Sequence, residues 1–122
     1  MPIIIKNIKK KYLQETTGLK IESLTDSQKL ESPVLVVNRL IFDSNIIGPE
    51  LTHTEIDQLL YVIKGNGIAK VNNEEFSLKK ESILWLETGE KYQFISGGIG
   101  LEILQGYAPA SMKEDIKNFK PK

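Results

Sequence analysis

Apolar and polar residues alternate along much of the chain from residue 33 onward, with the period of two that is typical of half-buried β-strands. Short alternating or continuous apolar runs follow one another, and residues that favour turns separate them. These runs are 34–42, 59–63, 68–71, 74–78, 83–86, 92–95 and 101–107. Short strands at such close and even spacing predict an antiparallel sandwich or barrel.

The best-defined hairpin is expected around two adjacent asparagines. Ile68–Val71 alternates up to Asn72 and Asn73, and Glu74–Leu78 alternates back. Asparagine tolerates the positive φ angles that a two-residue hairpin turn requires. The two runs are therefore predicted to pair as antiparallel strands.

Residues 1–32 lack a clean period, because leucines and isoleucines are mixed there with polar residues at irregular intervals. We expect this segment to be an extended arm that packs on the barrel of the same subunit or on a dimer partner, where it would also protect a sheet edge. The barrel itself is expected to span residues 33–110. Residues 111–122 are expected to form a tail, with a short helix after Ser111 as its N-cap.

Composition narrows the classes of function. The 122 residues include 16 basic and 16 acidic side chains, so the formal net charge is zero and nothing favours nucleic acid or an anionic membrane as a partner. The chain has no cysteine, which excludes disulfides, thiolate nucleophiles and cysteine-ligated metal sites. No apolar run is long enough for a signal peptide or a membrane span, so a cytoplasmic location is expected.

The spacing of two glycines resembles the two motifs of the cupin superfamily. Cupins carry G-x5-H-x-H-x(3,4)-E-x6-G and, further on, G-x5-P-x-G-x2-H-x3-N. Gly65 fits the glycine that closes the first motif, and Gly89 fits the central glycine of the second. Glu81 then stands where the second motif opens with glycine. The resemblance covers about half of the chain and implies an all-β fold, an antiparallel jelly-roll barrel.

The positions of the metal ligands depart from the cupin pattern. Counting back from Gly65 places Gln58 at the glutamate position, and the longer spacer places His53 at one of the two histidine positions. Counting forward from Gly89 places Tyr92 at the third histidine position. A divalent cation needs several imidazole or carboxylate donors to replace its hydration shell. No metal and no other cofactor is therefore expected.

His53, Gln58, Tyr61 and Tyr92 are the candidate ligand-binding residues, because polar tips on apolar neighbours suit a barrel interior that holds a small polar ligand. The alternative is that these tips satisfy one another in a filled core, as in a purely structural dimerisation domain. An enzyme, either metal-dependent or similar to the sugar-nucleotide epimerases of the superfamily, is a further alternative. In the epimerase-like form, His53 would be the base and Tyr92 the acid. The resemblance also implies a homodimer.

Overall fold

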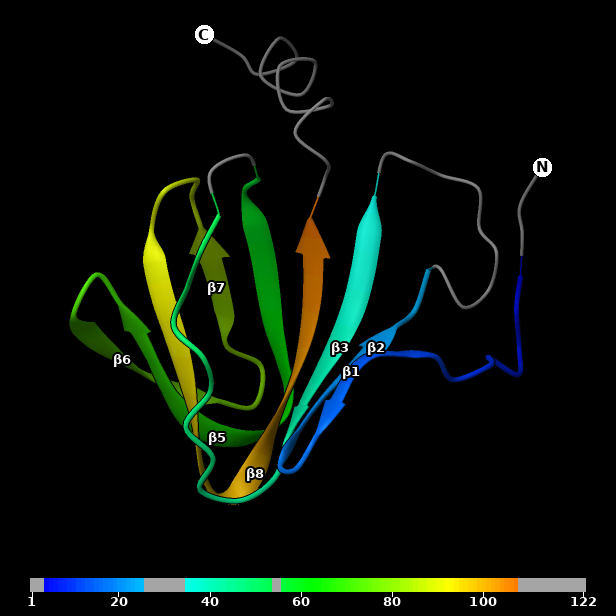
Figure 1. The fold of residues 1–122 in the computed structure, drawn as a ribbon, viewed down its shortest axis with the longest axis horizontal. Helices are drawn as coiled ribbons and strands as arrows, with labels where there is room; N and C mark the ends of the chain where they lie inside the picture. The colour runs from blue at the N-terminus through cyan, green and yellow to red at the C-terminus, as the bar shows by residue number, and fades with distance from the viewer. Residues whose placement is uncertain (1–3, 26–34, 54–55, 108–122) are drawn as a thin grey trace, which may run out of the picture.

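The computed structural model describes residues 4–25, 35–53 and 56–107, and every regular element in these ranges is a β-strand (Figure 1). The all-β, antiparallel prediction is thus confirmed. The expected C-terminal helix lies outside the described residues. The strands are β1 Tyr12–Thr16, β2 Leu19–Ser23, β3 Val36–Phe42, β4 Leu51–Thr52, β5 Gln58–Val71, β6 Glu74–Lys79, β7 Ile83–Leu86 and β8 Lys91–Tyr107.

Two long strands, β5 and β8, form the spine of the barrel. They pair antiparallel from Gln58↔Tyr107 to Val71↔Tyr92, and irregularities in the register occur at residues 62–67. In Figure 1 both strands bend at the bottom of the view and continue into opposite walls. The bend needs glycine, because Gly65 has a φ of 89° and a Cβ there would overlap the carbonyl oxygen of Gly100.

The remaining strands extend the two walls. The hydrogen-bonded order is β1-β2-β3-β8-β5-β6, while β4 pairs with β8 and β7 pairs with β5. The β5–β6 hairpin turns at Asn72 and Asn73, whose φ angles of 49° and 70° confirm the prediction for this turn. The N-terminal arm supplies the β1–β2 hairpin, and β2 pairs antiparallel with β3 of the same subunit.

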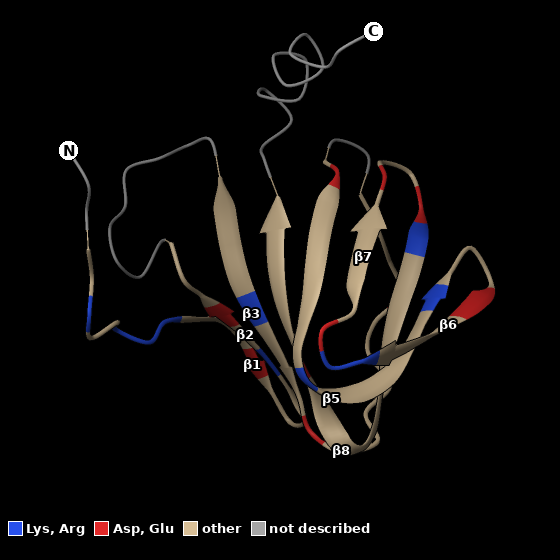
Figure 2. Ribbon diagram, turned by 180° about the vertical axis from the view of Figure 1, so that it is seen from behind, with Lys and Arg blue, Asp and Glu red and all other residues tan. Residues whose placement is uncertain are grey.

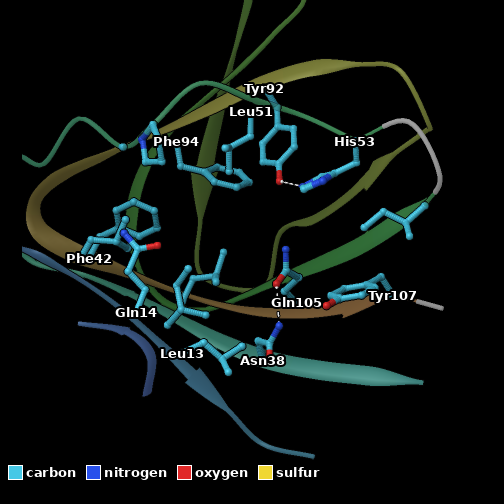
Figure 3. Close-up of a pocket in the computed structure, with 16 residues that line it drawn as sticks. Leu13, Gln14, Asn38, Phe42, Leu51, His53, Tyr92, Phe94, Gln105 and Tyr107 are labelled. Atoms are coloured by element: carbon cyan, nitrogen blue, oxygen red, sulfur yellow. Dashed lines mark hydrogen bonds between the residues drawn. The ribbon is translucent and has the colours of Figure 1, made fainter. Parts of the chain in front are cut away.

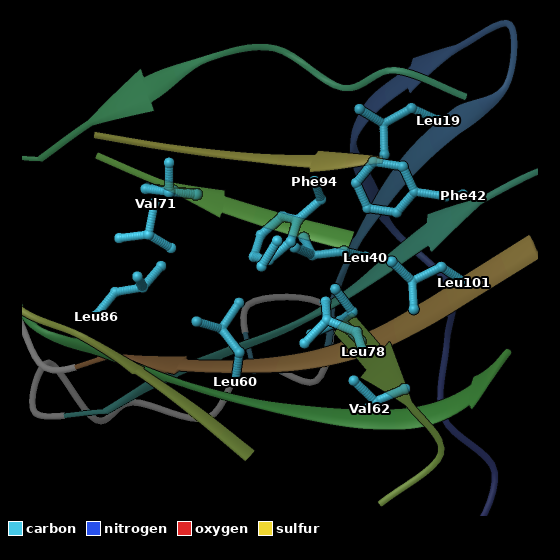
Figure 4. Close-up of a cluster of buried hydrophobic side chains, with 13 residues drawn as sticks. Leu19, Leu40, Phe42, Leu60, Val62, Val71, Leu78, Leu86, Phe94 and Leu101 are labelled. Carbon is cyan, nitrogen blue, oxygen red and sulfur yellow. The ribbon is translucent and has the colours of Figure 1, made fainter. Parts of the chain in front are cut away.

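The core lies between the two walls and is made of side chains that alternate inward along the strands (Figure 4). On β5, for example, Leu60 and Val62 are 2 % exposed, whereas Leu59 and Tyr61 point outward. The buried hydrophobic residues are Leu19, Leu40, Phe42, Leu60, Val62, Ala69, Val71, Leu78, Leu86, Tyr92, Phe94, Leu101 and Ile103.

A row of charged side chains crosses the outer face of the wall that contains β3 and β8. Arg39 lies 3.5 Å from Glu22 of β2 and 3.2 Å from Glu102 of β8, and Lys64 of β5 lies 3.3 Å from the other oxygen of Glu102. Figure 2 shows the blue band of β3 beside a red band on β2. Within the described ranges, no helix is long and apolar enough to cross a membrane.

Candidate ligand-binding cavity

An open cavity of about 340 Å³ lies inside the barrel (Figure 3). Apolar and aromatic side chains make up most of its wall, and none of the sixteen described residues that line it is Asp, Glu, Lys or Arg. The lining residues are Leu13, Gln14, Leu19, Ile21, Asn38, Leu40, Phe42, Gly48, Pro49, Leu51, His53, Ile56, Tyr92, Phe94, Gln105 and Tyr107. Four of them come from the β1–β2 hairpin.

His53 and Tyr92 form a hydrogen-bonded pair in the cavity wall. The Nε2 atom of His53 lies 2.7 Å from the Tyr92 hydroxyl. Two backbone contacts bring the residues together: Leu51 of β4 pairs with Tyr92 of β8, and the amide of Gly89 donates to the His53 carbonyl at 2.8 Å. The two side chains therefore contact each other, instead of facing each other across a bound molecule.

Two cavity-lining amides form a second pair, and Gln58 joins it to the first. Asn38 Nδ2 donates to Gln105 Oε1 at 3.2 Å, and Gln105 Nε2 donates to Gln58 Oε1 at 2.6 Å. Gln58 is in turn hydrogen-bonded to Tyr92, which contacts His53. We call these five residues the amide–phenol chain. Figure 3 shows Asn38 and Gln105 apart from Tyr92 and His53, with the cavity between them.

Burial raises the pKa of Tyr92 above its usual value of 10.0. The hydrogen bond from Gln58 acts in the opposite direction and lowers this pKa, while the nearby Tyr107 raises it. Desolvation is the largest of the three effects, and it raises the pKa because it penalises the charged phenolate. Tyr92 is therefore a neutral phenol around neutral pH, able to donate one hydrogen bond and accept others.

The donors at this site do not suit a tightly held divalent cation. His53 Nε2 is already bonded to Tyr92, and Gln58 Oε1 already accepts from Gln105. Among the residues that the structure describes, no group of three or more His, Cys, Asp or Glu side chains could hold a metal ion. Within the described part of the site, one imidazole without a carboxylate leaves too few ligands to replace the water around such an ion.

Several solved structures are similar to this chain over most of its length. KdgF from Halomonas sp. matches with a TM-score of 0.70 and 15% identity, over 81% of this chain and 86% of that one. An RmlC-like cupin from Shewanella frigidimarina matches with a TM-score of 0.70 and 18% identity, over 88% and 89% of the two chains. A predicted oxalate decarboxylase from Thermotoga maritima matches with a TM-score of 0.71 and 14% identity, over 88% and 99%.

The chain has the cupin fold. No protein-family model and no curated protein sequence matches it significantly. The cupin motifs nevertheless explain the turns of the barrel. Gly65 and Gly89 both have a φ of 89°, and Glu81 has a φ of 71° at the position where the cupin motif carries glycine. This cupin fold thus keeps a left-handed turn residue there while changing its side chain.

The candidate site residues of the cupin motifs lie in three different surroundings. His53 and Tyr92 line the cavity, as expected from counting along the motifs. Gln58 is 2 % exposed and lies behind the lining, where it accepts from Gln105. Tyr61 is 38 % exposed and lies outside the cavity, because it occupies the outward phase of β5.

Four lining residues with polar groups, Gln14, Asn38, Gln105 and Tyr107, were not among the candidates from the sequence. Strand phase was the signal that could have identified two of them. Asn38 has the same phase as Leu40 and Phe42 on β3, and it pairs in register with Gln105 of β8. A lone amide at an inward position of an otherwise apolar strand indicates a hydrogen-bonding role inside the barrel.

Proposed function

We propose that this protein binds an uncharged small molecule in the barrel cavity and does so without a tightly held metal. The observation that carries the proposal is the composition of the wall: an open cavity of about 340 Å³ with apolar sides, a few convergent polar groups and, among the described residues, no Asp, Glu, Lys or Arg. Small-molecule sites typically have this composition and occupy volumes of about 300–1,000 Å³.

The absence of charged lining residues favours a neutral ligand. A phosphate or carboxylate would lose its hydration on entering and would find no Lys or Arg among the described lining residues to replace it. This argues against the alternative of a sugar-nucleotide epimerase, whose substrate carries a diphosphate. The contact of 2.7 Å between His53 and Tyr92 argues in the same direction, because a base and an acid would need to flank the substrate.

Binding can be tested with a variant that fills the cavity. Leu13 lines the cavity and is 50 % exposed, so Leu13→Trp should narrow the cavity without disturbing the core. Leu59 is 44 % exposed on the outer face of β5 and gives the matched control, Leu59→Trp. The probe is α-methylstyrene, an uncharged apolar molecule, and binding is followed by ligand-detected NMR.

We expect α-methylstyrene to bind the original protein and Leu59→Trp with similar affinity, and to bind Leu13→Trp at least about tenfold more weakly. Equal binding by all three proteins would place the probe outside the barrel and contradict the proposal. Elemental mass spectrometry of the purified protein tests the second part. A stoichiometric transition metal that survives dialysis would contradict binding without a metal.

A further inference from the structure

The amide hydrogen bonds of the amide–phenol chain all run in one direction. This direction determines which hydrogen-bonding group a ligand must present. Asn38 donates to Gln105, and Gln105 donates to Gln58. The carbonyl oxygens of Gln105 and Gln58 therefore each accept one hydrogen bond. An amide nitrogen carries two hydrogens, and the nitrogens of Asn38 and Gln105 each use only one within the described residues.

Within the amide–phenol chain, Gln105 is the amide that a ligand can reach. It lines the cavity and is partly exposed, whereas Gln58 is buried behind it. Asn38 also lines the cavity but is only 3 % exposed, and its Oδ1 is enclosed without a hydrogen-bond partner. The accessible amide of the chain is thus Gln105, which has an N–H to spare.

Leaving an N–H without a hydrogen-bond partner costs more free energy than leaving one lone pair of a carbonyl oxygen unfilled. The carbonyl oxygens of Gln105 and Gln58 already accept one hydrogen bond each, so only their second lone pair is unfilled. We propose that the ligand, in the binding role inferred above, carries an uncharged acceptor oxygen, such as a ketone, ester or amide carbonyl, which accepts from Gln105 Nε2. The rest of the ligand is apolar, because most of the other described residues that line the cavity are leucine, isoleucine or aromatic residues. This inference rests on the proposed function.

Three uncharged probes of similar size separate the possible polar ends. Acetophenone carries a carbonyl acceptor, and α-methylstyrene has the same shape with a methylene group in place of the oxygen. Indole carries an N–H donor and no acceptor oxygen. Each probe is titrated against the original protein, Gln105→Leu and Gln105→Met, two substitutions that remove the amide at nearly constant volume.

We expect both variants to weaken acetophenone about five- to tenfold more than they weaken α-methylstyrene, the ratio that one hydrogen bond supplies. Comparing ratios cancels the different solubilities of the probes in water. Tyr61→Phe, outside the cavity, should leave the ratio unchanged. In ¹⁵N-labelled protein, acetophenone should shift the Gln105 side-chain amide signal more than α-methylstyrene does. Thermal unfolding shows whether either Gln105 variant has lost its fold. If one has, the affinity ratio measured with the other variant tests the inference.

Equal weakening of acetophenone and α-methylstyrene would show that Gln105 only supports the wall, and it would overturn the inference. If the Gln105 variants weaken the binding of indole more than that of acetophenone, the ligand presents a hydrogen-bond donor. This result would also overturn the inference. Both results leave cavity binding intact. Failure of all three probes to bind the original protein would instead contradict the proposed function, and the inference would fail with it.

Discussion

Two rows of polar side chains cross β3 and β8, one on each face of the same wall. The inner row is the amide–phenol chain, which passes from Asn38 through Gln105 toward Tyr92 and His53. The outer row contains Glu22, Arg39, Glu102 and Lys64. Asn38 and Arg39 are neighbours in sequence, yet one belongs to a row without formal charges and the other to a row of ion pairs.

The difference does not follow simply from exposure to water. Glu22 of the outer row is 1 % exposed, as buried as Gln58 of the inner row at 2 %. What distinguishes the outer row is that Arg39 lies beside Glu22 and Glu102 and so offsets their charge. Among the described lining residues the inner row has no such charged partner, and it borders an open cavity. Burial is thus compatible with charge where an opposite charge is in place, and the neutral inner row suits a neutral occupant.

The largest expected effect comes from placing a charge in the inner row. Gln58→Lys should lower the free energy of unfolding by about 3–4 kcal/mol, because the substitution places an ammonium at a position that is only 2 % exposed. The matched control is Leu59→Lys, one residue away on the outer face, which should cost less than about 1 kcal/mol. Urea denaturation measures both, and equal losses would contradict the contrast between the two faces.

A smaller effect is expected from removing the central cation of the outer row. Arg39→Met should lower the free energy of unfolding by about 2 kcal/mol, because it leaves the buried carboxylate of Glu22 without its partner. Lys64→Met removes a lysine whose side chain is 74% exposed and should cost less than about 0.5 kcal/mol.

Adding Glu22→Gln to Arg39→Met tests this explanation by urea denaturation. The second substitution removes the uncompensated charge, so the double variant should recover part of the lost stability. A double variant that is less stable than Arg39→Met alone would show that packing, and not charge, accounts for the loss.

The smallest effect is confined to alkaline pH. Burial raises the pKa of Tyr92 in the folded state above its unfolded value near 10. The folded protein then holds this proton more tightly, so the contribution to stability is complete below pH 10 and is lost as pH rises through the folded pKa. Urea midpoints measured from pH 9 upward should fall less steeply in Tyr92→Phe than in Tyr61→Phe. Parallel curves would contradict a buried, neutral Tyr92.

Strand periodicity and motif spacing predicted most of the fold, because both depend on local sequence. The asparagine turn at 72–73 and the glycines at 65 and 89 occur where the sequence pattern placed them. Spacing also predicted that His53 and Tyr92 face the inside of the barrel, since each lies a fixed number of residues from a motif glycine. Their 2.7 Å contact could not be predicted, because it depends on β4 pairing with the start of β8.

The inner row was harder to foresee because its members come from distant strands. Asn38 and Gln105 are 67 residues apart in sequence and meet only through the register of β3 and β8. Tyr61 shows the opposite problem, because its polar tip suggested an inward role while the alternation with Leu60 and Val62 turns it outward. For Asn38, Gln105 and Tyr61, the phase of the strand predicts whether the side chain faces the cavity better than the residue type does.

The β1–β2 hairpin has a practical consequence for anyone screening compounds. A shortened protein that starts at residue 33, where the strand pattern suggests that a minimal barrel begins, would keep β3 to β8. It would lose Leu13, Gln14, Leu19 and Ile21, a quarter of the sixteen described lining residues. Compounds screened against that fragment would encounter a cavity that lacks the wall formed by the β1–β2 hairpin. Compounds that bind the longer protein would then be missed.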